Sequence, residues 1–179
     1  IKDAYSTEFD PMCGSPLISE LPEQKKIEGL GGTMRLGAQD VQIKPDTLAC
    51  FLAGGKTSIH ERFRHRYEVD PGFIERLEAG GLIFSGRHPE QPIMQILELP
   101  SSGPEGTITH PYFIGAQFHP ELTSRPLTPQ PMFMGLVAAA LSHRFHSDEK
   151  AWKNLFSTNP ALRTWLFHKK NGQPQNSAH

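Results

Sequence analysis

Cysteine is scarce in this chain. Among its 179 residues only Cys13 and Cys50 occur, and they do not form a CxxC pair. A disulfide framework and a zinc ribbon are therefore not supported, and two isolated thiols fit a reducing compartment. No apolar run is long enough to cross a bilayer, and residues 1–8 lack the basic and then apolar pattern of a signal peptide. We expect a cytoplasmic protein without a membrane partner.

The chain also lacks an excess of charge of either sign. The chain has 18 lysines and arginines against 19 aspartates and glutamates, for a formal net charge of -1. Proteins that bind nucleic acid through their overall field carry a clear excess of cations, so we expect no nucleic-acid partner. A local stripe does exist, because Arg62, Arg64 and Arg66 share one face of a predicted strand. We interpret this stripe as a solvated or salt-bridged edge.

Two familiar ligand signatures are absent. None of the nine histidines lies in an HExxH pattern or at paired ligand spacing, so no metal site is predicted. Residues 54–57, Gly-Gly-Lys-Thr, match the end of a phosphate-binding loop, but Cys50 occupies the place of that motif's first glycine. We predict an ordinary tight turn there.

Turn residues are abundant, with 16 Gly and 16 Pro, while 37% hydrophobic and 21% charged residues are ordinary for a globular domain. Alternating and helical patterns together predict an α/β domain. The predicted strands cover 31–43, 59–69, 82–85, 93–99 and 112–118, and the predicted helices cover 47–52, 71–79 and 132–145.

Local signals refine these elements. Asp46 and Asp70 are the predicted N-caps of the first two helices. Residues 1–29 read as a long loop with short elements, and the polar tail 169–179 is predicted to be disordered. In the third helix the apolar residues at helical spacing predict a stripe that faces the core: Phe133, Leu136, Val137, Ala140 and Leu141.

The strongest chemical signal is the sequence GAQFHPE at residues 115–121. The apolar run before it predicts a buried strand that ends at His119, and Pro120 forces a turn that brings Glu121 toward the imidazole. A carboxylate on one ring nitrogen fixes the tautomer and leaves the other nitrogen to take a proton from a thiol or hydroxyl. We predict that His119 is a general base and Glu121 its orienting acid. The tripeptide alone is a weak motif, so the prediction depends on its context.

Three further stretches supply that context. They are STEF at 6–9, GGTMRLG at 31–37 and RHRYEV at 64–69, and they occur in the order of a known family. From about residue 1 to about residue 141 the chain resembles the class I glutamine amidotransferases and, among these, the glutaminase domain of the CTP synthases. The resemblance implies a flavodoxin-like layered sheet. It also implies glutamine hydrolysis that supplies ammonia for the ATP- and Mg-dependent amination of UTP to CTP.

The resemblance implies further site residues. Glu8 would bind the ammonium group of glutamine and Arg66 its carboxylate, with the backbone of Tyr67 beside them. These residue types suit the task, because a zwitterion needs an anion and a cation, and arginine offers a bidentate fork. Arg35 would lie near the surface that responds to the activator GTP.

One part of the family pattern is expected to be missing. In the family the nucleophile is a cysteine in a glycine-rich elbow that precedes the STEF motif, and so would precede Ile1. We therefore expect residues 1–146 to be the C-terminal part of an amidotransferase domain, incomplete at its N-terminal side, followed by a partly disordered extension over 147–179. The ATP- and UTP-binding synthase domain would also lie elsewhere, the chain itself would need no cofactor, and the intact enzyme would be a homotetramer.

Two other hypotheses remain open. In the first, the chain is a nucleophile-free binding or assembly module that holds glutamine through Glu8 and Arg66 without turnover. In the second, which leaves the three accompanying motifs unexplained, a hydrolase of unrelated fold uses His119 and Glu121 to activate another nucleophile such as Ser124.

Overall fold

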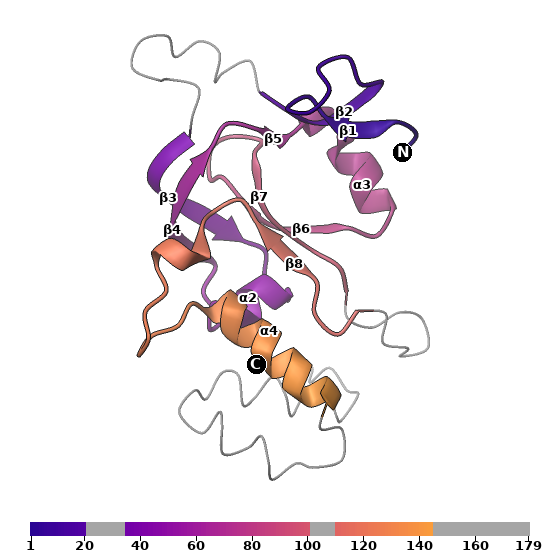
Figure 1. The fold of residues 1–179 in the computed structure, drawn as a ribbon. Coiled ribbons are helices and arrows are strands. Elements are labelled where there is room, and N and C mark those ends of the chain that lie inside the picture. The colour runs from indigo at the N-terminus through magenta and orange to yellow at the C-terminus, as the bar shows by residue number, and fades with distance from the viewer. Residues whose placement is uncertain (21–34, 101–109, 145–179) are drawn as a thin grey trace, which may run out of the picture.

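The computed structural model describes residues 1–20, 35–100 and 110–144 (Figure 1). The strands are β1 Ala4–Ser6, β2 Ser15–Ser19, β3 Arg35–Ile43, β4 Ser58–His65, β5 Glu68–Val69, β6 Ile83–Arg87, β7 Met94–Glu98 and β8 Ile114–Ala116. The helices are α2 Leu48–Leu52, α3 Ile74–Ala79 and α4 Pro131–Arg144, with 3-10 turns η1 Pro71–Phe73 and η3 Pro120–Leu122. The predicted extension 147–179 lies outside the described residues.

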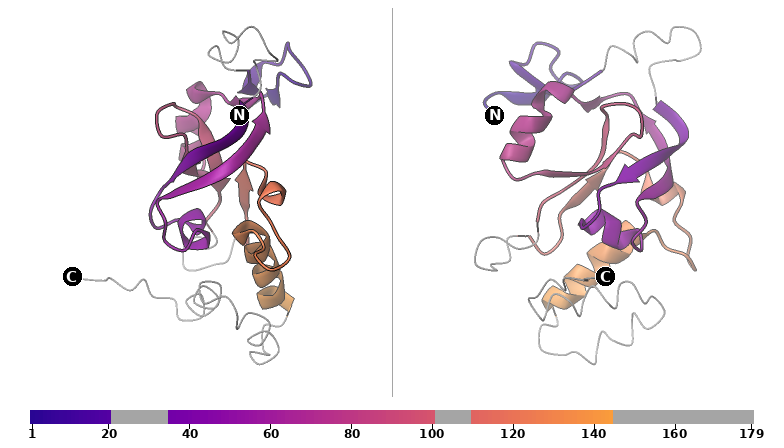
Figure 2. Two further views of the ribbon diagram at one scale, coloured as in Figure 1. Left: turned by 90° about the vertical axis from the view of Figure 1, so that its left-hand side faces the viewer. Right: turned by 180° about the vertical axis from the view of Figure 1, so that it is seen from behind.

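The strands form two sheets. The larger has the order β4-β3-β6-β7-β8, and each of its described pairings is antiparallel. The smaller has the order β1-β2-β5, with β1 and β2 parallel. Helices α2 and α4 lie together at one end of the larger sheet, while α3 and the smaller sheet lie at the other (Figures 1 and 2). The described residues thus form a mixed α/β fold, and the α/β prediction is confirmed.

The larger sheet curls so that its two edges approach each other. Its strand order puts β4 and β8 at opposite edges, yet the N–H of His119, just beyond β8, donates to the carbonyl of Arg62 in β4 at 2.9 Å. Inside the curl, the rings of Phe63 and Phe118 meet edge to face with centroids 6.1 Å apart. The core therefore lies within the curl, and the end of β8 is held against β4.

The strand predicted over 59–69 is wrong in one respect, because it is two strands in different sheets. Within β4 the expected alternation holds, with Arg62 and Arg64 exposed and Phe63 only 2% exposed. The chain then turns at residues 66–67 and enters the smaller sheet as β5. An ion pair between Nε2 of His65 and Oε1 of Glu68, 2.9 Å apart and largely buried, spans this corner. A period of two cannot reveal such a change of sheet, because β5 has only two residues and both are buried.

The predicted cap of α2 is also wrong. Asp46 has a positive φ of 59°, so it lies before the helix, and Thr47 is the N-cap. The Thr47 hydroxyl oxygen accepts from the N–H of Cys50 at 3.2 Å. Cys50 is a buried core residue, as expected. Residues 54–55 form the turn that ends the helix, both with positive φ, so they follow a helix rather than lead into one as a phosphate-binding loop does.

Helix α4 is present as predicted, and Leu141 packs against the core as expected. Most of the other residues predicted for the inward face are exposed instead. The large side chains of Phe133, Leu136 and Val137 are 41–54% exposed, and Ala140 is also exposed. Small residues face inward instead, because a Cβ on Gly135 would come within 2.8 Å of Leu52 and Tyr112. Close approach of α4 to α2 selects the small residues, and hydrophobicity alone cannot predict that choice. The buried residues of α4 are Gly135, Ala138 and Ala139.

Candidate active site

His119 lies where the chain leaves the larger sheet and enters η3. Pro120 is the first residue of this short helix, a position that suits its fixed φ and missing N–H. The N–H of Leu122 donates to the carbonyl of His119 at 3.0 Å, and the N–H of Ser124 donates to that of Pro120 at 3.0 Å. The turn is therefore tight, and it directs the side chain of Glu121 back toward the imidazole.

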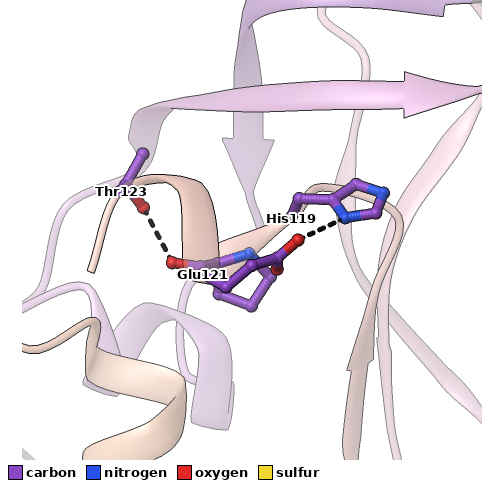
Figure 3. Close-up of polar contacts among 4 residues, drawn as sticks. His119, Glu121 and Thr123 are labelled. Atoms are coloured by element: carbon purple, nitrogen blue, oxygen red, sulfur yellow. Dashed lines mark hydrogen bonds and ion pairs between the residues drawn. The ribbon is translucent and has the colours of Figure 1, made fainter.

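The two predicted catalytic side chains are in contact. Nδ1 of His119 and Oε1 of Glu121 are 2.7 Å apart (Figure 3). The two side chains are 35% and 56% exposed, so the pair is open to solvent. With a proton on Nδ1 donated to the carboxylate, Nε2 is left as the proton acceptor. This is the geometry that a general base with an orienting acid requires.

The charge of Glu121 is stabilised by its neighbours. The hydrogen bond from His119 is the main cause that lowers the pKa of this carboxyl below its usual range, and a backbone hydrogen bond adds to the effect. The charges of His119 and Arg64 act in the same direction. Glu121 is therefore ionised at neutral pH and can hold a proton on Nδ1 of the imidazole.

Tyr67 lies beside the strand that carries the base. Its carbonyl accepts a hydrogen bond from Nε2 of Gln117 at 3.1 Å, and Gln117 is two residues before His119. Arg66, the preceding residue, is exposed at the corner between the two sheets. The fold thus brings the predicted contacts for the α-carboxylate of glutamine next to the segment that holds the predicted base.

Glu8 reaches the same region through the smaller sheet. Its neighbour Thr7 donates from its N–H to the carbonyl of Ile18 at 2.9 Å, and Ile18 pairs with Val69. The loop that contains Glu8 is therefore tied to β5, which directly follows Tyr67. Glu8 itself is exposed, and its N–H donates to Oγ of Ser6 at 3.2 Å. Within residues 1–20, 35–100 and 110–144, no hydrogen bond or ion pair joins Glu8 to Arg66.

Arg35 begins β3 and pairs in register with His65. Its backbone thus lies opposite the residue that precedes Arg66.

The predicted base has no nucleophile as a partner in the described part of the chain. Cys50 is buried, and its thiol lies 3.8 Å from the carbonyl of Lys56. Cys13 is a free, partly exposed thiol in the loop between β1 and β2. The hydroxyl oxygen of Ser124 accepts from the N–H of Gln130 at 3.2 Å, and within the described residues no hydrogen bond joins this hydroxyl to His119. These contacts give no support to a serine hydrolase.

Among the residues that the structure describes, no group of three or more histidines, cysteines, aspartates or glutamates could hold a metal ion. None of the described helices combines the length and the apolar character that crossing a bilayer requires.

Sequence reasoning missed the polar residues that support the turn. Glu61 is a carboxylate on the inward face of β4, only 9% exposed, and it accepts a hydrogen bond from the hydroxyl of Thr123 at 3.1 Å. The sequence does contain a signal for Glu61. It lies on the same face of the predicted strand as Ile59 and Phe63, and this face is otherwise apolar. A carboxylate at such a position indicates a buried polar partner.

Comparison with known proteins gives concordant matches. A family model described as Glutamine amidotransferase class-I matches residues 12–139, which include every predicted site residue except Glu8. The CTP synthase of Thermococcus gammatolerans is 49% identical over 146 residues, which make up 81% of this chain and 26% of that protein. The CTP synthase of Haloarcula marismortui is 52% identical over 147 residues, 82% of this chain and 25% of that protein. The chain thus spans about a quarter of the length of these relatives.

A solved structure matches as well. The CTPS glutaminase domain of Trypanosoma brucei, determined with bound acivicin, superposes with a TM-score of 0.67 at 29% identity. The match covers 78% of this chain and 51% of that chain. The likeness therefore extends over most of this chain.

Proposed function

Because this chain belongs to the class I glutamine amidotransferase family, we propose that it is the base-bearing part of the glutaminase domain of a CTP synthase. The observation that carries the proposal is the contact of 2.7 Å between Nδ1 of His119 and Oε1 of Glu121. Identity of 49% with a CTP synthase over 81% of the chain supports the assignment to that branch of the family.

Glutamine would be held at the corner between the two sheets. Glu8 would accept hydrogen bonds from its ammonium group, and the guanidinium of Arg66 would bind its α-carboxylate with two parallel hydrogen bonds. The backbone at Tyr67, which is anchored by Gln117, would lie beside them. Exposure of both charged side chains supports this role, because the substrate must reach them from solvent.

His119 would move the protons of the reaction. A cysteine thiol attacks the amide carbon of glutamine, Nε2 of His119 takes the thiol proton, and the departing ammonia receives it. Water then attacks the glutamyl thioester, again losing a proton to Nε2, and glutamate and the thiol are released. We assign the thiol to a cysteine other than Cys13 and Cys50, because Cys50 is buried in the core and Cys13 has no contact with the base.

The ammonia would aminate UTP that ATP has phosphorylated. ATP, Mg and UTP would belong to a separate synthase domain, as the similarity to CTP synthases implies. Arg35 would contribute to the response to GTP. The intact enzyme would be a cytoplasmic homotetramer that makes CTP for pyrimidine nucleotide synthesis.

Release of ammonia from glutamine tests the proposal. The chain would be assayed alone and with a separately expressed amidotransferase segment that carries the nucleophile cysteine of a relative. We expect activity only in the mixture, and we expect His119→Ala to abolish it. His60→Ala is a matched control, because Nδ1 of His60 also lies 2.7 Å from a carboxylate, that of Asp40, on an exposed surface. It should leave the activity unchanged.

The same experiment addresses the binding-module alternative. That hypothesis is favoured by the absence of a thiol next to the base within the described residues. If the mixture stays inactive while calorimetry shows that the chain binds glutamine and that Arg66→Lys weakens the binding, the chain is a module without turnover. Activity that survives His119→Ala would contradict the catalytic proposal directly.

A further inference from the structure

Glu61 is a buried carboxylate that the proposed reaction does not use. It lies in β4 and is 9% exposed, at the edge of a small cavity otherwise lined mainly by apolar side chains such as Ile59, Phe118 and Met132. A charged group in such surroundings is unfavourable unless hydrogen bonds satisfy it. Its presence on the inward face of a strand therefore calls for a specific role.

Both oxygens of Glu61 accept hydrogen bonds from the segment that follows the His119–Glu121 pair. Oε2 accepts from the hydroxyl of Thr123 at 3.1 Å, and Oε1 accepts from Nε2 of Gln130 at 3.2 Å. Thr123 ends the η3 turn that contains Glu121, and Gln130 immediately precedes α4. One carboxylate thus connects β4 to both ends of the loop between η3 and α4.

Gln130 is itself fixed in orientation. Its Oε1 accepts from the N–H of Met132 at 2.7 Å, and its N–H donates to Oγ of Ser124 at 3.2 Å. The side-chain amide therefore must present its NH₂ group to Glu61. Since Gln130 is only 6% exposed, water does not compete strongly for these bonds. Glu61, Gln130 and their partners therefore form a buried polar network. Each hydrogen bond named in this network has a defined donor and acceptor.

The residue after Glu61 holds the other side of the same turn. The carbonyl of Arg62 accepts from the N–H of His119 at 2.9 Å. Two consecutive residues of β4 therefore fix the turn where it begins, at His119, and where it ends, at Thr123. The pair between them is open to water, at 35% and 56% exposure, so its own hydrogen bond is a weak restraint.

We propose that Glu61, acting through Thr123, is a positioning residue that keeps Glu121 in contact with Nδ1 of His119 during glutamine hydrolysis. The proposal rests on the proposed function. The hydroxyl of Thr123 has one proton, and the carboxylate of Glu61 at 3.1 Å is a better acceptor than the carbonyl of Pro120 at 3.3 Å (Figure 3 shows the latter contact). Thr123 therefore joins the buried network to the exposed pair.

Substitutions at Thr123 test this link with little change in volume. Thr123→Val removes the hydroxyl and keeps the shape, whereas Thr123→Ser keeps the hydroxyl. Thr57→Val is the matched control, because Thr57 is exposed and, among the described residues, no hydrogen bond involves its hydroxyl, whereas its carbonyl accepts from the N–H of Ile43. Glu61→Gln retains one acceptor and should behave as an intermediate variant, since the rotating hydroxyl of Thr123 can accept from the new amide.

The first readout is the pKa of Glu121, which can be measured without the cysteine-bearing segment. The titration of the Glu121 carboxyl is followed by NMR in the full chain, where His119 and Arg64 are the charged groups that act on it. In Thr123→Val the pKa of Glu121 should rise toward its ordinary value, because the contact with His119 loosens. In Thr123→Ser and Thr57→Val it should stay low. The same pKa of Glu121 in the wild type and in the three variants Thr123→Val, Thr123→Ser and Thr57→Val would overturn the proposal.

The second readout is glutaminase activity in the mixture with the cysteine-bearing segment. We expect Thr123→Val to lower kcat by about 10- to 100-fold, the effect of misplacing a catalytic group by a fraction of its contact distance, with little change in KM. Thr123→Ser should restore kcat. A raised KM with unchanged kcat would contradict a positioning role. If the wild-type mixture is inactive but Thr123→Val still shifts the titration, the proposed function fails and the anchoring role stands.

Discussion

Single side chains decide how the candidate site responds to pH. Glu121 is exposed, and its pKa is lowered mainly by the hydrogen bond from His119. A carboxyl whose pKa is lower in the folded than in the unfolded chain adds stability above the unfolded pKa and loses it as the pH falls through the folded pKa. The relevant window therefore lies at and below the ordinary glutamate value of 4.5.

We accordingly predict that Glu121→Gln is less stable than the wild type at pH 7, and that the difference shrinks as the pH falls below 4.5. Urea unfolding at a series of pH values measures this. Glu90→Gln, which removes another exposed glutamate, should show a smaller change over the same range. A difference for Glu121→Gln that is constant with pH would mean that the carboxylate gains nothing from His119.

At the scale of elements, the sequence patterns predicted which segments form strands and helices better than where each one ends. The hairpin of β6 and β7 and the long helix α4 are confirmed, and Asp70 is a cap as predicted, although it caps the 3-10 turn η1 that precedes α3 rather than α3 itself. The continuous strand over 59–69 was wrong, because the chain changes sheets after His65, and this depends on a partner strand far away in sequence. Most of the inward face predicted for α4 was wrong because packing against Leu52 and Tyr112 favours small residues over the larger apolar ones.

The pairing of β6 with β7 yields a prediction at this scale. Gly86 lies at an irregularity in their register, and a Cβ there would come within 2.5–2.8 Å of Cγ1, Cδ1 and Cβ of Ile96. Because Ile96 is only 3% exposed and part of the core, it cannot move aside freely. Gly86→Ala should destabilise the fold by about 1–3 kcal/mol, measured by urea unfolding.

A compensating change provides the check on that explanation. In an Ile96→Ala background the close contacts of Gly86→Ala with Cγ1 and Cδ1 of Ile96 are removed, and the contact with Cβ at 2.8 Å remains. The second substitution should then cost less than it does alone. Equal costs in both backgrounds would mean that the contacts with Cγ1 and Cδ1 do not account for the glycine.

At the scale of the whole molecule, the family match and the described fold end at nearly the same place. The family model ends at residue 139 and α4 ends at Arg144. We therefore predict that removing residues 147–179 leaves the glutaminase activity of the reconstituted mixture within about twofold of the full chain, as is usual for segments outside a domain. Ammonia release measures it. If the truncated chain loses activity and a high concentration of glutamine does not restore it, residues 147–179 have a structural role.

The amidotransferase-type α/β fold and the similarity to CTP synthases followed from the sequence, because short ordered motifs carry that information locally. The adjacency of His119 and Glu121 was also predictable, since the two residues are joined by one proline turn. The roles of Glu8, Arg66, Tyr67 and Arg35 stay predictions.

Only the tertiary structure decided how that turn is held. His119 is bound to Arg62 and Thr123 to Glu61, contacts that span about 60 residues of chain and exist because the larger sheet curls its edges together. Tyr67 is likewise fixed by Gln117, 50 residues away. A local pattern contains the chemistry of a short motif, whereas the hydrogen bonds that position the motif depend on which distant strand the fold brings beside it.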